Sequence, residues 1–175
     1  MAPDSDQPCA SSASPAGEPP HLDLDRFVPF LVIALANKVG VSASRLLLER
    51  FGCGITEWRI ISMLAGQDGI APGAITSVTG IDKSSVSRAL KTLEARDQVK
   101  VLADPGHKRR QLLSLTPAGR TLHDRIIGLV AARESLLLTG FSEAELEELT
   151  GYLHRMLDNV PLVKAFSREQ ARGDT

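Results

Sequence analysis

A cluster of basic and small polar residues lies between Asp82 and Lys91 of the 175-residue chain. At helical spacing its cations and hydroxyls share one face, and Val86 and Leu90 lie on the other. Arginine donates two hydrogen bonds to guanine, and serine suits phosphates and bases, so such a face can bind DNA. The residues predicted to contact DNA here are Lys83, Ser84, Ser85, Ser87, Arg88 and Lys91. For this segment alone, an ordinary capped surface helix is the alternative.

A second basic cluster follows Asp104-Pro105-Gly106, which is a typical turn sequence. It consists of His107, Lys108, Arg109 and Arg110, and short β-like runs at 99–102 and 112–115 flank it. The pattern predicts a hairpin with a cationic tip. Such a tip can enter the negative minor groove of DNA or bind its phosphates, so all four residues are predicted DNA contacts.

The charge of the chain is segregated, although its net value is only −1. Residues 82–120 hold nine Lys or Arg against four Asp or Glu, a balance of +5, and the remaining 11 basic and 17 acidic residues give −6. An electrostatic footprint is local, so a basic centre within an acidic frame favours a polyanion at the centre. Aromatic residues make up 4%, which argues against an RNA-stacking sheet.

The elements that must position these residues are mostly helices. Apolar spacing and end signals predict helices at 24–50, 56–66, 72–79, 83–97, 117–139 and 142–159. The predicted N-caps include Thr56, Asp82, Thr116 and Ser142, and Pro161 is expected to lie beyond the last helix. The predicted fold is mainly α, a winged helix-turn-helix lobe with a two-stranded wing between long N- and C-terminal helices.

The predicted domain covers residues 21–166, with a DNA-binding lobe at about 55–115. A tail at 1–20 contains five prolines and four serines, and residues 167–175 are expected to form a second tail. The flanking helices, at about 24–50 and 117–166, carry more apolar surface than a monomer buries easily. They are predicted to dimerise through Phe27, Phe30, Leu31, Leu153, Leu157, Leu162, Val163 and Phe166.

The sequence resembles the MarR family of winged helix-turn-helix transcription regulators over about residues 24–160. The residues that carry the resemblance are 81–88, the wing around Asp104-Pro105 and Arg109, and the stretch 113–120. The resemblance implies a homodimer with one recognition helix on each half-site of an inverted repeat, and Arg109 in the minor groove. Relatives often have Asp where this chain has His107, so a carboxylate that braces the wing arginines is not implied here.

The resemblance also implies control by a small molecule, an aromatic acid or an acyl-coenzyme A thioester, bound between the dimer arm and the DNA-binding lobe. The candidate ligand residues are Ser42, Arg45, Trp58, Arg59 and His123, because the first, second and fifth helices should converge there. An arginine in such a cleft would suit a carboxylate or phosphate. The alternatives are a core position for Trp58 and salt bridges or DNA phosphate contacts for the arginines.

Other classes of function find less support. A redox switch through Cys53 is an alternative within DNA binding, and a protein-interaction module that uses the wing is an alternative outside it. The histidines at 21, 107, 123 and 154 lack metal-ligand spacing, and no cofactor or enzyme motif is present. Without a signal peptide or an uninterrupted apolar run of membrane length, the protein is expected to be cytoplasmic and away from membranes.

Overall fold

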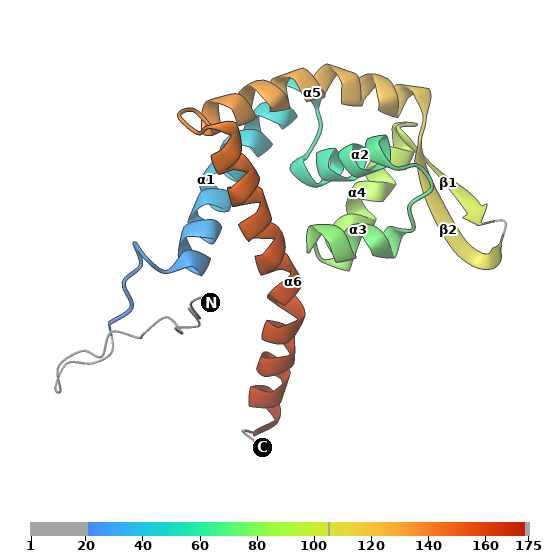
Figure 1. The fold of residues 1–175 in the computed structure, drawn as a ribbon. Coiled ribbons are helices and arrows are strands. Elements are labelled where there is room, and N and C mark those ends of the chain that lie inside the picture. The colour runs from blue at the N-terminus through green and yellow to red at the C-terminus, as the bar shows by residue number, and fades with distance from the viewer. Residues whose placement is uncertain (1–20, 105, 174–175) are drawn as a thin grey trace, which may run out of the picture. The chain divides into compact units, whose positions relative to one another are not determined.

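The computed structural model describes residues 21–104 and 106–173, so the predicted tail at 1–20 lies outside the described residues (Figure 1). Two compact units meet within one helix, between His123 and Asp124. The elements in chain order are α1 (Val28–Phe51), α2 (Ile55–Gly66), α3 (Pro72–Thr79), α4 (Lys83–Ala95), β1 (Val99–Asp104), β2 (His107–Leu115), α5 (Pro117–Leu137) and α6 (Glu143–Gly173). The mainly helical fold with one small antiparallel sheet confirms the predicted fold class.

Helix α1 begins at Val28, four residues later than its apolar stripe predicted. Proline is favoured in the first turn of a helix, and Pro29 therefore sets the beginning of α1. The helix ends at Phe51, one residue after the predicted end, and its C-cap Gly52 has a φ of 62°, in the left-handed region that glycine adopts freely.

Many apolar side chains of α1 are exposed, and by length and composition α1 could cross a membrane. The lack of a long uninterrupted apolar run therefore did not exclude a helix of membrane-spanning length and composition. The polar residues of α1 are scattered, and most of the helix is still apolar. The core helix of a soluble protein can have the same length and composition. In water, the exposed side chains need a cover.

The first unit has its core where α2, α3 and α4 pack together beside the hairpin (Figure 1). Ile60, Ile61 and Leu64 of α2 are fully buried, as are Ile75 of α3 and Leu93 of α4. Full burial of such side chains stabilises a fold by about 1.5–3 kcal/mol each. This core holds α4 so that its opposite, polar face points away from the lobe.

The wing is an antiparallel pair of strands in which Val99 lies opposite Leu115. Its strands are longer than predicted and reach Asp104 and His107 beside the turn. Ile70 forms an isolated bridge with Leu113, with hydrogen bonds of 2.9 and 3.2 Å. The sequence contains no signal for this bridge, because a single paired residue has no periodicity.

The base of the wing meets the beginning of α5 at a tight contact. Thr116 caps α5 as predicted, since its Oγ1 accepts a hydrogen bond from the Gly119 amide at 3.1 Å. The Thr116 hydroxyl also donates to the carbonyl of Asp97, and the Thr116 amide donates to the Gln98 carbonyl at 3.2 Å. A Cβ on Gly119 would lie 2.0 Å from that Gln98 oxygen, so only glycine fits at this position.

In the second unit, α6 differs from its prediction at its C-terminal end. The capping box at Ser142 is present, because Ser142 and Glu145 exchange hydrogen bonds. The helix then continues through Pro161 to Gly173, so the expected end before Pro161 and the expected tail from 167 are wrong at those residues. An exposed proline removes one backbone hydrogen bond and can be tolerated where water solvates the freed carbonyl, so proline alone did not end the helix.

Gly119→Ala should lower the free energy of unfolding by about 3 kcal/mol or more, because the new methyl group would force α5 away from the Gln98 carbonyl. Gly128 is the matched control, since it is also in α5 and has open space around its Cα. Gly128→Ala should raise the free energy of unfolding by up to about 1 kcal/mol through helix propensity. Urea unfolding measures both, and equal effects would contradict the tight contact.

Candidate nucleic-acid interface

The beginning of α4 is organised by Asp82. Its Oδ1 accepts hydrogen bonds from the Ser85 amide at 2.9 Å and from the Ser84 hydroxyl at 2.5 Å. Hydrogen bonds from Ser84, and then from Ser85, lower the pKa of Asp82 below its usual range. The carboxylate therefore stays ionised at the positive end of the helix, where an anion is favoured. The predicted N-cap is confirmed.

The same serines orient Arg88. Its Nη2 donates to Ser85 Oγ at 2.9 Å and its Nη1 to Ser84 Oγ at 3.4 Å. Because Ser84 gives its own proton to Asp82, its oxygen is left to accept from the guanidinium. The chain from Asp82 through Ser84 to Arg88 fixes the arginine over the first turn of the helix. A fixed guanidinium has lost part of its side-chain entropy before it meets a ligand.

The two faces of α4 divide as the sequence predicted. Val86, Ala89, Leu90 and Leu93 are buried against the lobe. Of the residues proposed to contact DNA on α4, Ser85 is half-buried and the others are exposed, namely Lys83, Ser84, Ser87, Arg88 and Lys91. These side chains form one basic and hydroxyl-rich surface, called here the α4 surface. No acidic residue other than the cap lies within residues 82–91.

The basic tip of the wing is placed by its backbone alone. His107, Lys108, Arg109 and Arg110 open β2, and His107 lies opposite Asp104 at a shift in strand register. The side chains of these four residues lie outside what the structure describes. Asp104 Oδ1 accepts the Gly106 amide at 2.8 Å, so a carboxylate does brace this turn, from the strand before it.

Of the five candidate ligand residues, the structure brings Trp58 and His123 together. Their rings stack with centroids 5.7 Å apart and planes at 18°. Trp58 is buried, as its alternative assignment to the core predicted. Ser42 and Arg59 are exposed, and Arg45 forms an exposed ion pair with Glu49 at 2.8 Å.

Ser62 is a polar residue of α2 that was not among the predicted site residues. It lies one turn after Trp58, and its Oγ is buried without a hydrogen-bond partner among the described residues. Positions four apart share one face of a helix, so Ser62 extends the face that carries Trp58. A serine in an apolar stripe gives no signal in sequence, because only burial distinguishes it from a surface serine.

Cys53 does not have the surroundings of a redox sensor. Its side chain is fully buried, and its Sγ donates to the Gly54 carbonyl at 3.6 Å. Burial, and next the charge of Glu57, raise the pKa of the Cys53 thiol to about 12, although Arg96 opposes them. A reactive cysteine needs an exposed thiolate, so the structure argues against the redox alternative. Cys9 lies outside the described residues.

Within residues 21–104 and 106–173, no group of three or more His, Cys, Asp or Glu side chains could hold a metal ion. The features that stand out are the α4 surface, the hairpin beside it and the three-helix core beneath it. Together they define a winged helix-turn-helix, in which a recognition helix and a wing are presented side by side.

Comparison with known proteins identifies the family. The MarR family model matches residues 51–110. The crystal structure of a MarR/EmrR family transcriptional regulator from Acinetobacter sp. ADP1 is 33% identical, covers 81% of this chain and 99% of its own, and has a TM-score of 0.75. This chain belongs to the MarR family and is a transcription regulator.

Two curated proteins are similar at lower identity. The HTH-type transcriptional regulator YwaE of Bacillus subtilis is 24% identical over 135 residues, which are 73% of this chain and 79% of YwaE. The HTH-type transcriptional repressor NicR of Pseudomonas putida is 25% identical over 85 residues, which are 49% of this chain and 54% of NicR.

Cys53 should resist modification and should make stability depend on alkaline pH. In a Cys9→Ser background, Ellman's reagent at pH 8 should not label the folded protein. Between pH 9, near the ordinary thiol pKa, and about 12, the unfolded chain releases the Cys53 proton and the folded chain keeps it. The folding equilibrium constant should therefore fall by up to ~10-fold per pH unit over this range.

The control for the pH dependence is Cys53→Ala in the same background, because other groups also titrate above pH 9. Urea unfolding at pH 8, 9 and 10 should give a steeper loss of stability for the protein that retains Cys53. Rapid labelling of folded protein, or identical slopes for both proteins, would contradict the buried neutral thiol.

Proposed function

We propose that this protein is a ligand-responsive repressor that binds an inverted-repeat DNA operator as a homodimer. The observation that carries the proposal is the α4 surface, whose Arg88 is oriented by Ser84 and Ser85 before any DNA is present. A structure of the Staphylococcus aureus MepR–DNA complex has the same fold, with a TM-score of 0.67 at 22% identity. NicR, which shares part of this sequence, is a repressor.

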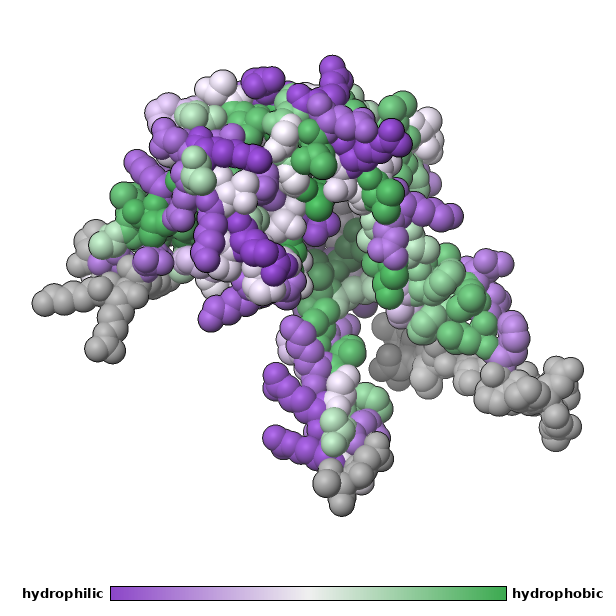
Figure 2. Space-filling view, turned by 180° about the vertical axis from the view of Figure 1, so that it is seen from behind, coloured by the Kyte–Doolittle hydropathy of each residue, from purple (hydrophilic) through white to green (hydrophobic). Residues whose placement is uncertain are grey.

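Exposed apolar side chains support the homodimer. In α1, Phe30 and Leu31 are exposed, as is Phe27 just before the helix. In α6, none of the residues is buried, and the exposed apolar positions include Leu153, Leu157, Leu162, Val163 and Phe166. Figure 2 shows hydrophobic residues, in green, at the surface in the region of α1, and on α6 it shows them mixed with hydrophilic ones, in purple. A second copy of the chain would cover these surfaces, and it would present two recognition helices to two half-sites.

The stacked pair of Trp58 and His123 supports a small-molecule site beside α2 and the beginning of α5. Aromatic rings stack on a flat ligand, and the buried Ser62 hydroxyl would donate to it. Two structures with this fold, both 20% identical, contain ligands, CouR of Rhodococcus jostii with p-coumaroyl-CoA and PcaV of Streptomyces coelicolor with its natural ligand. The proposed effector is an aromatic acid or its coenzyme A thioester, with Ser42, Arg45 and Arg59 as further candidate contacts.

The proposed mechanism is a change in the spacing of two recognition helices. Operator binding requires them about one helical turn of DNA apart, roughly 34 Å. An effector that binds more tightly to a dimer with another spacing would shift the population away from the DNA-competent geometry. Repression follows when the bound dimer occludes a promoter. These steps need neither an enzyme reaction nor a cofactor, and they belong in the cytoplasm with the DNA.

The test is a mobility-shift assay of the full chain on its own upstream intergenic DNA, with excess nonspecific duplex and a series of aromatic acids and acyl-coenzyme A thioesters. A competitor-resistant shift that one compound releases is the expected result. Release by peroxide and by no compound would favour Cys53 as the sensor. The absence of a specific shift at every salt concentration would overturn the proposal. The protein-interaction module would then be the remaining alternative.

Arg88→Ala should weaken operator binding by about 1–3 kcal/mol and relax the base preference at one position, if Arg88 binds a base. Lys91→Ala is the comparison from the next turn of α4. If Lys91 contacts a phosphate, Lys91→Ala should weaken binding to all duplexes alike. The slope of log affinity against log salt concentration should then become smaller by about one. Fluorescence anisotropy on operator and random duplexes measures both, and an unchanged base preference for Arg88→Ala would exclude base contact.

Arg109→Ala should reduce affinity more evenly across DNA sequences, because the wing arginine is proposed to occupy the minor groove rather than bind bases of the major groove. Lys100→Ala, on the exposed side of β1, is the control for loss of a positive charge in the wing. Both variants are titrated against the same operator at two salt concentrations. Equal affinity of wild type and Arg109→Ala would exclude a role for the wing arginine.

A further inference from the structure

The connection between α1 and the DNA-binding lobe is only three residues long, Gly52-Cys53-Gly54. Gly52 ends α1, with its amide donating to the Leu48 carbonyl at 3.0 Å, and Gly54 precedes α2. Cys53 between them is fully buried. Two glycines around one anchored side chain give a backbone that turns easily unless something else holds it.

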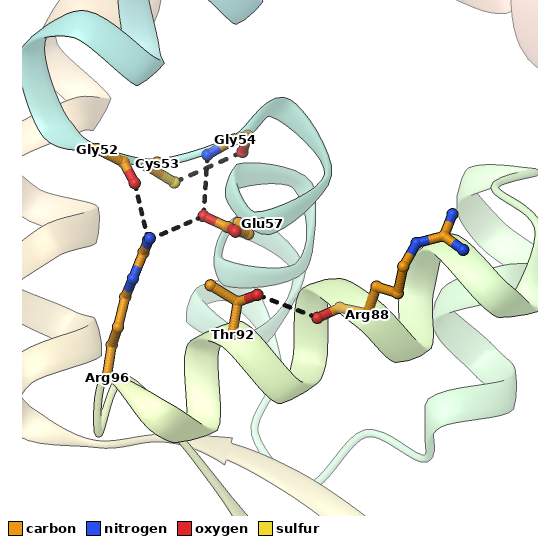
Figure 3. A network of polar contacts seen from close by, with 7 residues as sticks. All are labelled: Gly52, Cys53, Gly54, Glu57, Arg88, Thr92 and Arg96. Atoms are coloured by element: carbon orange, nitrogen blue, oxygen red, sulfur yellow. Dashed lines mark hydrogen bonds and ion pairs between the residues drawn. The ribbon is translucent and has the colours of Figure 1, made fainter.

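Arg96, directly after α4, holds this connector. Its Nη1 donates to the Gly52 carbonyl at 2.7 Å and lies 3.3 Å from Glu57 Oε2. The same Glu57 oxygen accepts the Gly54 amide at 2.9 Å. One guanidinium nitrogen and one carboxylate oxygen thus join the end of α4, the end of α1 and the beginning of α2 (Figure 3).

The charges match the helix ends that they touch. Arg96 binds a carbonyl at the negative end of α1, and Glu57 lies in the first turn of α2, at its positive end. The Glu57 side chain is 14% exposed and that of Arg96 is 46% exposed, so solvent screens the pair only in part. These contacts span 44 and 39 residues of sequence, so they form only when the lobe has folded on α1.

We infer that Arg96 is a positioning residue that sets the orientation of the recognition helix relative to α1. This inference rests on the proposed dimeric DNA binding, in which α1 belongs to the dimer arm. Arg96 lies eight residues after Arg88, which corresponds to about 12 Å along a helix. Figure 3 shows the two arginines at opposite parts of α4, with Arg88 directed away from the connector. The role of Arg96 is therefore separate from DNA contact.

Without Arg96, the glycine connector can turn, and the two recognition helices of a dimer are no longer held at one separation. Each lobe keeps its α4 surface and its affinity for one half-site. The dimer loses its discrimination between operators with different half-site spacing, because a loosely joined lobe can follow a displaced half-site. The preference for one half-site spacing therefore measures how firmly the connector is held. The affinity for an isolated half-site measures whether the lobe is correctly folded.

The experiment uses the full chain and an operator selected from a randomised duplex library. Affinity is measured for that operator, for versions with two base pairs inserted or removed between half-sites, and for an isolated half-site. Wild type should prefer its own spacing by ~10-fold or more, and Arg96→Met should reduce this preference to about threefold or less at unchanged half-site affinity. Glu57→Gln should act in the same direction, and Arg96→Lys, which keeps the charge, should restore part of the preference.

Arg50→Met is the matched control, because Arg50 is an exposed arginine in the last turn of α1 that makes none of these bridging contacts. It should keep the wild-type preference. Equal preference in wild type, Arg96→Met and Glu57→Gln would overturn the inference, as would a loss of half-site affinity in parallel with spacing preference. If Arg96→Met does not fold, the spacing preferences of Glu57→Gln and Arg96→Lys test the inference in its place. Failure of wild type to select any operator would instead overturn the proposed function.

Discussion

The close contact between α5 and the end of the recognition helix constrains the whole first unit. The backbone turns from α4 into the wing at Asp97, which adopts a φ of 53°, and the next carbonyl, of Gln98, accepts the Thr116 amide. Gly119 lies so near that carbonyl that no side chain fits. The end of the recognition helix, the base of the wing and the first turn of α5 are therefore in direct contact, and none of these three segments can shift without the others.

At the other end of α4, polar contacts rather than packing decide the geometry. Asp82 holds Ser84 and Ser85, which in turn hold Arg88. An exposed arginine would otherwise sample many rotamers, and fixing it on binding costs free energy. The negative cap also lies in a segment of net charge +5, so the positive potential of the α4 surface remains. Local order and positive charge thus coincide where a polyanion would bind.

A transcription regulator of this architecture needs both rigidity and a point of movement. The lobe is rigid because Ile60, Ile61, Leu64 and Leu93 fill its core. The connector Gly52-Cys53-Gly54 combines flexible backbone with a buried thiol whose raised pKa keeps it neutral. This member of the MarR family therefore uses Cys53 for packing. Its Arg96–Glu57 ion pair connects the end of α4 to the beginning of α2.

The elements with local signals follow from the sequence alone. Caps at Asp82, Thr116 and Ser142 and the periodicity of α4 come from residues a few positions apart, which is why the helix-turn-helix, the hairpin and the exposed face of α4 were predictable. The expectation at Pro161 was wrong because the cost of the proline depends on solvation of one carbonyl. The N-cap predicted at Thr56 was also wrong, because Gly54 is the N-cap of α2 and Thr56 lies in its first turn. Other features required the packed fold: the Ile70 bridge, the burial of Cys53 and of the Ser62 hydroxyl, the stacking of Trp58 on His123 and the contact of Arg96 with Gly52. Each depends on residues distant in sequence, whose contacts exist only after the chain has packed.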